Sequence, residues 1–179
     1  MSTGSIRISI VRSGSGSCKF GAGFTLVEMM IVLVILAVLL VLAAPTFTQS
    51  GLTTRLKSYS NLLVSSVHLA RGEAIKRNTD VSLCVSNPAG TACTTGGWEQ
   101  GWIVQTVDGT VLLHQQALDE AFKLTGSVDS LTLGSTGLSS TPANFKVCRS
   151  NPVGAQERVV DVTATGKARI STTELGTCP

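Results

Sequence analysis

One stretch of the chain is almost entirely apolar. Between Phe24 and Ala44 there are 21 residues, and Glu28 is the only charged residue among them. At a rise of about 1.5 Å per residue, a helix of this length extends about 31 Å, close to the thickness of a hydrocarbon core. The pattern therefore predicts a membrane-spanning helix over residues 24–45.

A second helical pattern follows Pro45, a residue expected to bend the helix. Apolar residues recur at spacings of three and four, which is typical of an amphipathic helix with one buried stripe. The stripe comprises Leu52, Leu56, Tyr59, Leu63, Val67, Ala70 and Ala74. We expect this half of the helix to occupy residues 46–78.

From Asp80 the apolar period changes to two, as in Val81, Leu83 and Val85, which indicates a strand. Two hairpins are predicted, over 102–107 with 110–114 and over 158–164 with 168–172. Asp108-Gly109 suits the first tight turn, and Thr165-Gly166-Lys167 is the second turn. Weaker strand patterns cover 122–124, 128–133 and 145–148, and 134–142 reads as a loop. The fold class is α+β, with one long N-terminal helix packed on a mainly antiparallel β domain over 79–179.

Glu28 needs an explanation, because a lone carboxylate in a membrane helix costs roughly 2.5–3.5 kcal/mol on insertion scales and usually has a partner. A secretory signal would be cut after the apolar core at a small-x-small site, which this core lacks. A lipoprotein would have a Cys after the core, and a simple anchor would not need the carboxylate.

The string GFTLVE, residues 23–28, resembles the processing site of type IV prepilins and type II secretion pseudopilins. The resemblance implies removal of a leader over residues 1–23 by a prepilin peptidase, which cuts between Gly23 and Phe24, and N-methylation of Phe24. It also implies that Glu28 pairs with the Phe24 amine of a neighbouring subunit. The protein would then be a single-pass inner-membrane protein with a periplasmic β domain that later joins a pilus or pseudopilus.

The expected leader changes the charge balance. It holds three of the 14 basic residues and none of the 11 acidic ones, so the formal charge of +3 belongs to the leader. Three positive charges before an apolar segment favour retention of the leader on the cytoplasmic side.

Residues 67–86, VHLARGEAIKRNTDVSLCVS, carry a narrower resemblance. With Gly97-Trp98, Gly101-Trp102 and the run Gly166-Lys167-Ala168-Arg169, they are similar to the GspH/FimT/FimU branch of minor pilins and pseudopilins. The resemblance implies a pilin-like fold and a low-copy subunit that assembles with other pilin subunits, in pilus assembly or initiation or at the filament tip. Paired cysteines and tryptophans favour a type IV pilus minor pilin, and the alternative is a GspH-like pseudopilin of a type II secretion system.

Four cysteines fall outside the expected leader, and an oxidising compartment would allow three connectivities. We favour Cys84–Cys93, which encloses a turn-rich stretch, and Cys148–Cys178, which would tie down the tail. Four free thiols and a zinc site are the alternatives, but no CxxC or paired histidine supports zinc.

The C-terminal region has a local excess of basic residues. Lys167 and Arg169 are two apart, so on a strand they share one face, opposite Ala168 and Ile170. Three further basic residues, Lys146, Arg149 and Arg158, precede them. In FimT-type members a Gly-Arg-x-Arg tail motif is tied to DNA binding during natural transformation. Here Lys167 replaces the first arginine, which keeps the charge but loses bidentate phosphate geometry. A solvated hairpin face is the other interpretation.

Catalysis and cofactors have little support in the sequence. His68 and His114 fall on different predicted elements, and no nucleophile–base order, metal motif or phosphate loop accompanies them. We therefore expect no enzymatic activity, no cofactor and no metal.

Overall fold

The computed structural model describes residues 23–174 and 178, with the side chains of 42–49 left aside. The predicted leader therefore lies outside the described residues except for Gly23. The chain divides into two compact units, Met1–Ala44 and Pro45–Pro179, and each is considered by itself.

A single helix, α1 (Leu26–Arg77), accounts for 52 residues. It begins two residues later than the apolar pattern predicts, because Thr25 caps it. The Thr25 hydroxyl accepts a hydrogen bond from the backbone N–H of Glu28 at 3.2 Å. The helix ends where Asn78 adopts a left-handed conformation, with φ of 52°. A search of the described residues found no helix with the length and apolarity that a membrane crossing requires.

In the second unit, α1 packs one stripe against the β domain. Five of the seven predicted stripe residues are buried, and Leu52 and Tyr59 are partly buried against the same core. The sequence prediction for this face is therefore confirmed.

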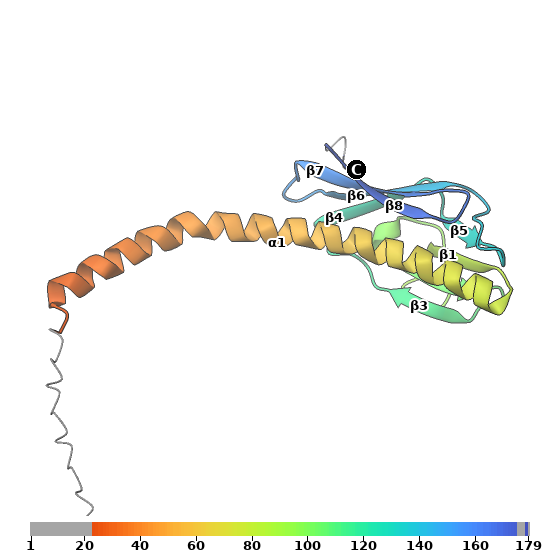
Figure 1. Cartoon of the computed structure of the whole chain (residues 1–179), viewed down its shortest axis with the longest axis horizontal. Coiled ribbons are helices and arrows are strands. Elements are labelled where there is room, and N and C mark those ends of the chain that lie inside the picture. Colours follow the sequence, from red (N-terminus) through yellow and green to blue (C-terminus); the bar gives the residue numbers. More distant parts are fainter. Residues whose placement is uncertain (1–22, 175–177, 179) are drawn as a thin grey trace, which may run out of the picture. The chain divides into compact units, whose positions relative to one another are not determined.

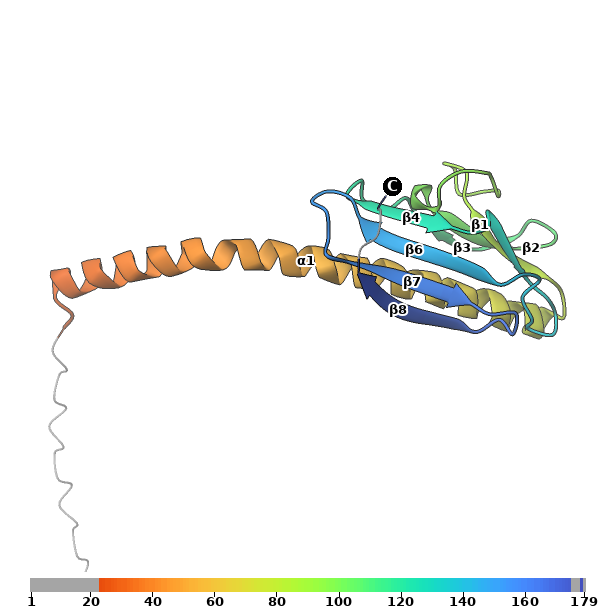
Figure 2. The same ribbon diagram turned by 90° about the horizontal axis from the view of Figure 1, so that it is seen from above.

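The β domain contains two four-stranded antiparallel sheets (Figures 1 and 2). The first has the order β3-β2-β1-β5 and consists of β1 (Val81–Val85), β2 (Trp102–Thr106), β3 (Val111–Gln115) and β5 (Ser130–Leu133). The second has the order β4-β6-β7-β8 and consists of β4 (Phe122–Gly126), β6 (Ala143–Arg149), β7 (Gln156–Val162) and β8 (Ala168–Glu174). One buried cluster joins apolar residues of α1 and of both sheets.

Both predicted hairpins are present, as the β2–β3 and β7–β8 pairs. Gly109 and Gly166 occupy their turns with φ of 82° and 69°, values that favour glycine. The second hairpin is longer than predicted, because β7 begins at Gln156 and β8 continues to Glu174. The three weaker strand patterns correspond to β4, β5 and β6.

The two tryptophans of the sequence motif lie in the core. A 3-10 helix, η1 (Trp98–Gln100), places Trp98 against Phe145, with ring centroids 4.8 Å apart in an edge-to-face arrangement. The indole N–H of Trp98 donates to the Val128 carbonyl at 2.8 Å, and that of Trp102 donates to the Ser66 hydroxyl at 2.8 Å. Both large side chains are thus buried with their polar atoms satisfied.

Candidate functional site: the N-terminal helix and the basic strands

The residues of the predicted processing and pairing site lie at the N-terminal end of α1, just before the helix and in its first turn. Phe24 is 76% exposed and immediately precedes the capping residue Thr25. Glu28 lies in the first turn, where a carboxylate interacts favourably with the helix dipole. The Thr25-x-x-Glu28 spacing is that of a capping box, a local signal that hydropathy alone does not reveal. Among the described residues, Glu28 forms no ion pair.

The following turns of α1 expose their apolar side chains within the first unit. Large side chains from Leu26 to Val41 are about half exposed or more. Five of them outline an apolar groove of about 360 Å³, formed by Val27, Met30, Ile31, Val34 and Ile35. Their spacing places them along one face of the helix. A contiguous apolar surface of this kind marks a site covered by a protein or a membrane.

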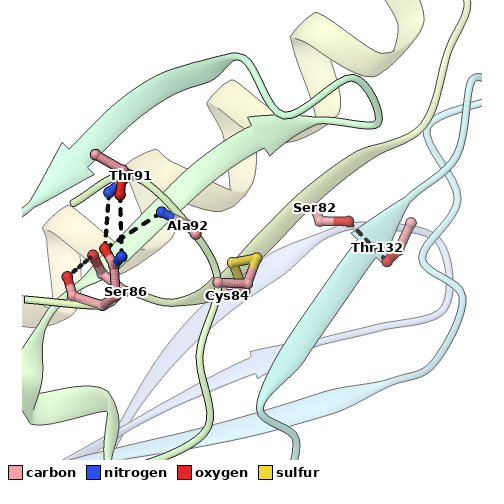
Figure 3. The surroundings of a disulfide bond; sticks show 8 residues. Ser82, Cys84, Ser86, Thr91, Ala92 and Thr132 are labelled. Carbon is pink, nitrogen blue, oxygen red and sulfur yellow. Dashed lines mark hydrogen bonds between the residues drawn. A yellow bond between two sulfur atoms is a disulfide. The ribbon is translucent and has the colours of Figure 1, made fainter. Parts of the chain in front are cut away.

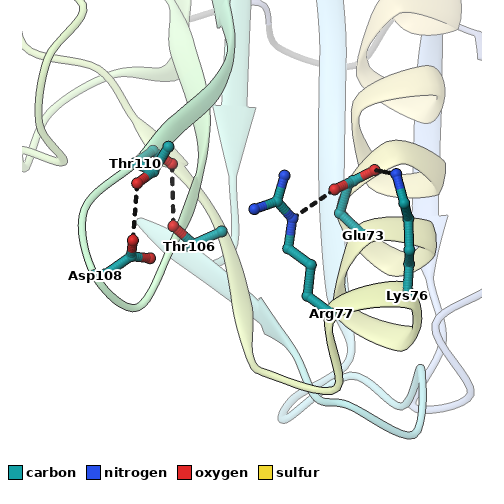
Figure 4. Close-up of polar contacts among 6 residues, drawn as sticks. All are labelled: Glu73, Lys76, Arg77, Thr106, Asp108 and Thr110. Atoms are coloured by element: carbon teal, nitrogen blue, oxygen red, sulfur yellow. Dashed lines mark hydrogen bonds and ion pairs between the residues drawn. The ribbon is translucent and has the colours of Figure 1, made fainter.

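Ion pairs between residues of the helix itself stabilise the C-terminal end of α1 (Figure 4). Glu73 accepts from Arg77 Nε at 2.6 Å and from Lys76 Nζ at 3.4 Å. These contacts, the hydrogen bond from Arg77 above all, lower the pKa of Glu73. In the nearby β2–β3 turn, hydrogen bonds from Thr106 and then Thr110 lower the pKa of Asp108.

Both favoured disulfides are present. Cys84 and Cys93 have Cα atoms 5.6 Å apart and join β1 to the loop that follows it (Figure 3). Asn87 organises that loop, since its Oδ1 accepts from the backbone N–H of Thr91 at 2.9 Å and of Ala92 at 3.3 Å. Cys148 on β6 is linked to Cys178, with Cα atoms 5.8 Å apart. Within residues 23–174 and 178, no group of three or more potential ligands lies together as a metal site would require.

The five basic residues considered for DNA do not gather on one surface. Arg169 is exposed on β8, while Ala168 and Ile170 pack against the core, as the alternation predicted. Lys167 is also exposed but precedes the strand. Arg169 lies directly opposite Asp161 of β7, so an acid is its cross-strand neighbour.

The remaining three basic residues lie on β6 and β7 in different surroundings. Lys146 forms an ion pair with the buried Glu157 at 3.1 Å. Arg158 pairs in register with Val147, a core residue, and therefore projects from the core-facing side of β7. Arg149 is two residues from Val147, shares that side and is only 6% exposed. Strand register therefore places Arg149 and Arg158 on the other face of the sheet from Arg169, and DNA binding by the five basic residues stays a prediction.

The histidines also lie apart in the fold. His68 is exposed on α1, and His114 is exposed on β3 beside the loop that contains Gly90. Neither forms a hydrogen bond or an ion pair with another described residue.

Comparisons with known proteins agree with this architecture. The family model described as type II transport protein GspH matches residues 60–166, and the prokaryotic N-terminal methylation motif matches residues 20–44. The solved type IV minor pilin FimU of Pseudomonas aeruginosa (strain PAO1) is similar at a TM-score of 0.51 and 18% identity, over 64% of this chain and 91% of that chain. The minor pseudopilin EpsH from the type 2 secretion system of Vibrio cholerae is similar at a TM-score of 0.50 and 15% identity, over 64% of this chain and 94% of that chain. No sequence among the curated proteins matches the chain.

Proposed function

Because the chain belongs to the GspH family and has the α+β, pilin-like fold, we propose that it is a minor pilin of a type IV pilus. Pilin-family proteins are structural subunits that assemble with other pilin or pseudopilin subunits. In this proposal the protein acts in pilus assembly or initiation, or at the filament tip.

The observation that carries the proposal is the apolar, exposed first part of α1 with Glu28 as its single charge. The methylation motif spans this region. We propose that a prepilin peptidase cleaves between Gly23 and Phe24, and that Phe24 is then N-methylated. Residues 24–45 would hold the protein in the inner membrane, with the β domain in the periplasm, until Glu28 pairs with the Phe24 amine of a neighbour. In lipid both charges lose water, and pairing offsets part of that loss.

Structural similarity does not distinguish a pilus subunit from a subunit of a secretion pseudopilus, because one of these two neighbours belongs to each system. The two disulfides fit either system, since cross-links persist both in the oxidising periplasm and outside the cell. Deleting the gene should abolish piliation or twitching and leave exoprotein release intact. Lost exoprotein release with normal pili would instead identify a minor pseudopilin.

DNA binding is a second candidate function, favoured by two exposed residues, Lys167 just before β8 and Arg169 on it. The test is a titration of residues 46–179 with duplex DNA at low and moderate salt, because phosphate contacts weaken steeply with salt. Lys167→Ala with Arg169→Ala should reduce the affinity, whereas Lys57→Ala on α1 should not. Equal affinity of the double variant and the unmodified protein would eliminate this site.

A further inference from the structure

A groove of about 170 Å³ lies in the second unit, between α1 and the segment that joins β6 to β7. Leu52 and Leu56 form its helix side, and Arg149, Gly154, Gln156 and Arg158 form much of the opposite side. For comparison, an engineered protein cavity of about 150 Å³ admits benzene. The groove is therefore large enough for one side chain of a partner.

Strand register places both arginines at this groove. Arg158 lies opposite Val147 on the side of the sheet that faces the core, and Arg149 is the next residue of β6 on that side. Arg149 is held in place, because it is almost fully buried and its Nη2 donates to the Val153 carbonyl at 3.3 Å. Arg158 is half-buried at the groove. Two guanidinium groups thus flank one small space.

The charge of Arg158 is not neutralised within the part of the chain that the structure describes. Four other basic residues, Arg55, Lys76, Arg77 and Lys146, each form an ion pair with an acid. On the side of the sheet that carries Arg158, the nearest acid in the strand register is Glu174, which lies opposite Gln156, but no ion pair between described residues joins it to Arg158. A half-buried, uncompensated guanidinium favours an anion, and its planar fork suits a carboxylate.

Leu52 and Leu56 add apolar surface to the helix side of the groove, which restricts the ligand further. Leu56 is buried, Leu52 is partly buried, and Val153 in the adjoining loop is 66% exposed. A small inorganic anion would leave these surfaces in water, whereas an acidic side chain with an apolar neighbour would cover them.

We propose that this groove receives an aspartate or glutamate side chain, flanked by apolar residues, from a neighbouring pilin subunit. The proposal rests on the proposed function, because it assumes that the protein assembles with other pilins. It adds a docking site on the globular unit that is separate from Glu28 and the apolar helix.

The test is photo-cross-linking in cells that produce the full-length chain, with a diazirine amino acid in place of Ala155, an exposed residue that lines the groove. We expect a cross-link to a peptide of another pilin subunit that contains Asp or Glu beside an apolar residue. Arg158→Gln should reduce its yield about tenfold, because truncating one partner of a buried charged pair is costly. Arg158→Lys should give an intermediate yield, and Lys57→Gln, which removes one exposed charge from α1, should leave the yield unchanged.

A charge exchange makes the test specific. Arg158→Glu should abolish the cross-link, and replacing the partner's acid by arginine should restore it. Cross-links to lipid alone, or to a pilin peptide without an acid, would overturn the proposal, as would equal yields for Arg158→Gln and the unmodified protein. If the chain still co-purifies with filaments in that case, the minor-pilin function stands and only the groove proposal falls. If the chain is absent from filaments, both fall.

Discussion

Ser66 is the polar connection between α1 and the first sheet. Its hydroxyl accepts the indole N–H of Trp102 at 2.8 Å and donates to the Leu62 carbonyl at 2.8 Å. Both Ser66 and Trp102 are buried, so water cannot replace this contact. One hydroxyl on the helix therefore provides the hydrogen-bond acceptor for the buried indole N–H of Trp102 on β2.

Replacing Ser66 by alanine should destabilise the globular unit. The Trp102 N–H would lose its partner, and a buried unsatisfied donor costs about 1–3 kcal/mol. Ser60→Ala is the matched control, because Ser60 is equally buried but bonds only to the Leu56 carbonyl of its own helix. Urea unfolding of residues 46–179 measures both changes. Equal unfolding free energies for the two variants would show that the Trp102 contact contributes nothing.

Gly166 should tolerate substitution less well than Gly109. Both have positive φ, but a Cβ at Gly166 would overlap the Gly137 carbonyl oxygen, whereas a Cβ at Gly109 meets no atom within 4 Å. Gly109→Ala should cost about 1 kcal/mol for the left-handed conformation, and Gly166→Ala clearly more, since backbone must also move. Thermal unfolding of the two variants checks the order. A smaller loss of stability at Gly166 would show that the backbone near Gly137 moves away from the added Cβ at little cost.

At the scale of elements, the sequence predicts what depends on local periodicity. The stripe on α1 and both hairpins follow from spacings of three, four and two, and each is present. Lys146 and Arg149 are an odd number of residues apart, so alternation alone already separates their faces. Which face meets the core depends on pairing with β7 and on the position of α1, and neither is encoded locally. For this reason the groove beside Arg158 had no signal in the sequence.

The C-terminal end of α1 should weaken in acid. Because the pKa of Glu73 is lowered in the folded state, its ion pairs with Arg77 and Lys76 stabilise the fold above the unfolded pKa of about 4.3 and are lost as pH falls through the folded value. Glu73→Gln should therefore lower the urea midpoint at pH 6, and its difference from the unmodified protein should shrink as the pH falls below the unfolded value. Glu120→Gln, at an exposed residue before β4, serves as the control. A midpoint difference that stays constant as the pH falls would contradict the ion-pair explanation.

At the scale of the whole molecule, the two units differ in how much of their apolar surface is buried. The second unit buries its apolar residues among α1 and two sheets and is cross-linked by two disulfides. The first unit leaves its apolar residues exposed along one helix. Folding of a single chain buries the apolar side chains of the second unit but not those of the first. The first unit therefore needs a membrane or other subunits to cover its apolar surface. The Arg158 groove would give the second unit a contact of its own in such an assembly.

Glu28→Val separates an anchor from an assembly element, because the two roles predict opposite effects. Removing a lone carboxylate should ease membrane insertion by roughly 2.5–3.5 kcal/mol, so a simple anchor would work as well or better. If Glu28 pairs with the Phe24 amine of a neighbour, the variant should be cleaved and inserted normally but excluded from filaments. Gel mobility, membrane fractionation and recovery in sheared filaments measure the three steps, with Leu33→Val as an apolar control in the same segment. Normal recovery of Glu28→Val in filaments would reject the pairing and leave Glu28 the lesser role of helix cap beside Thr25.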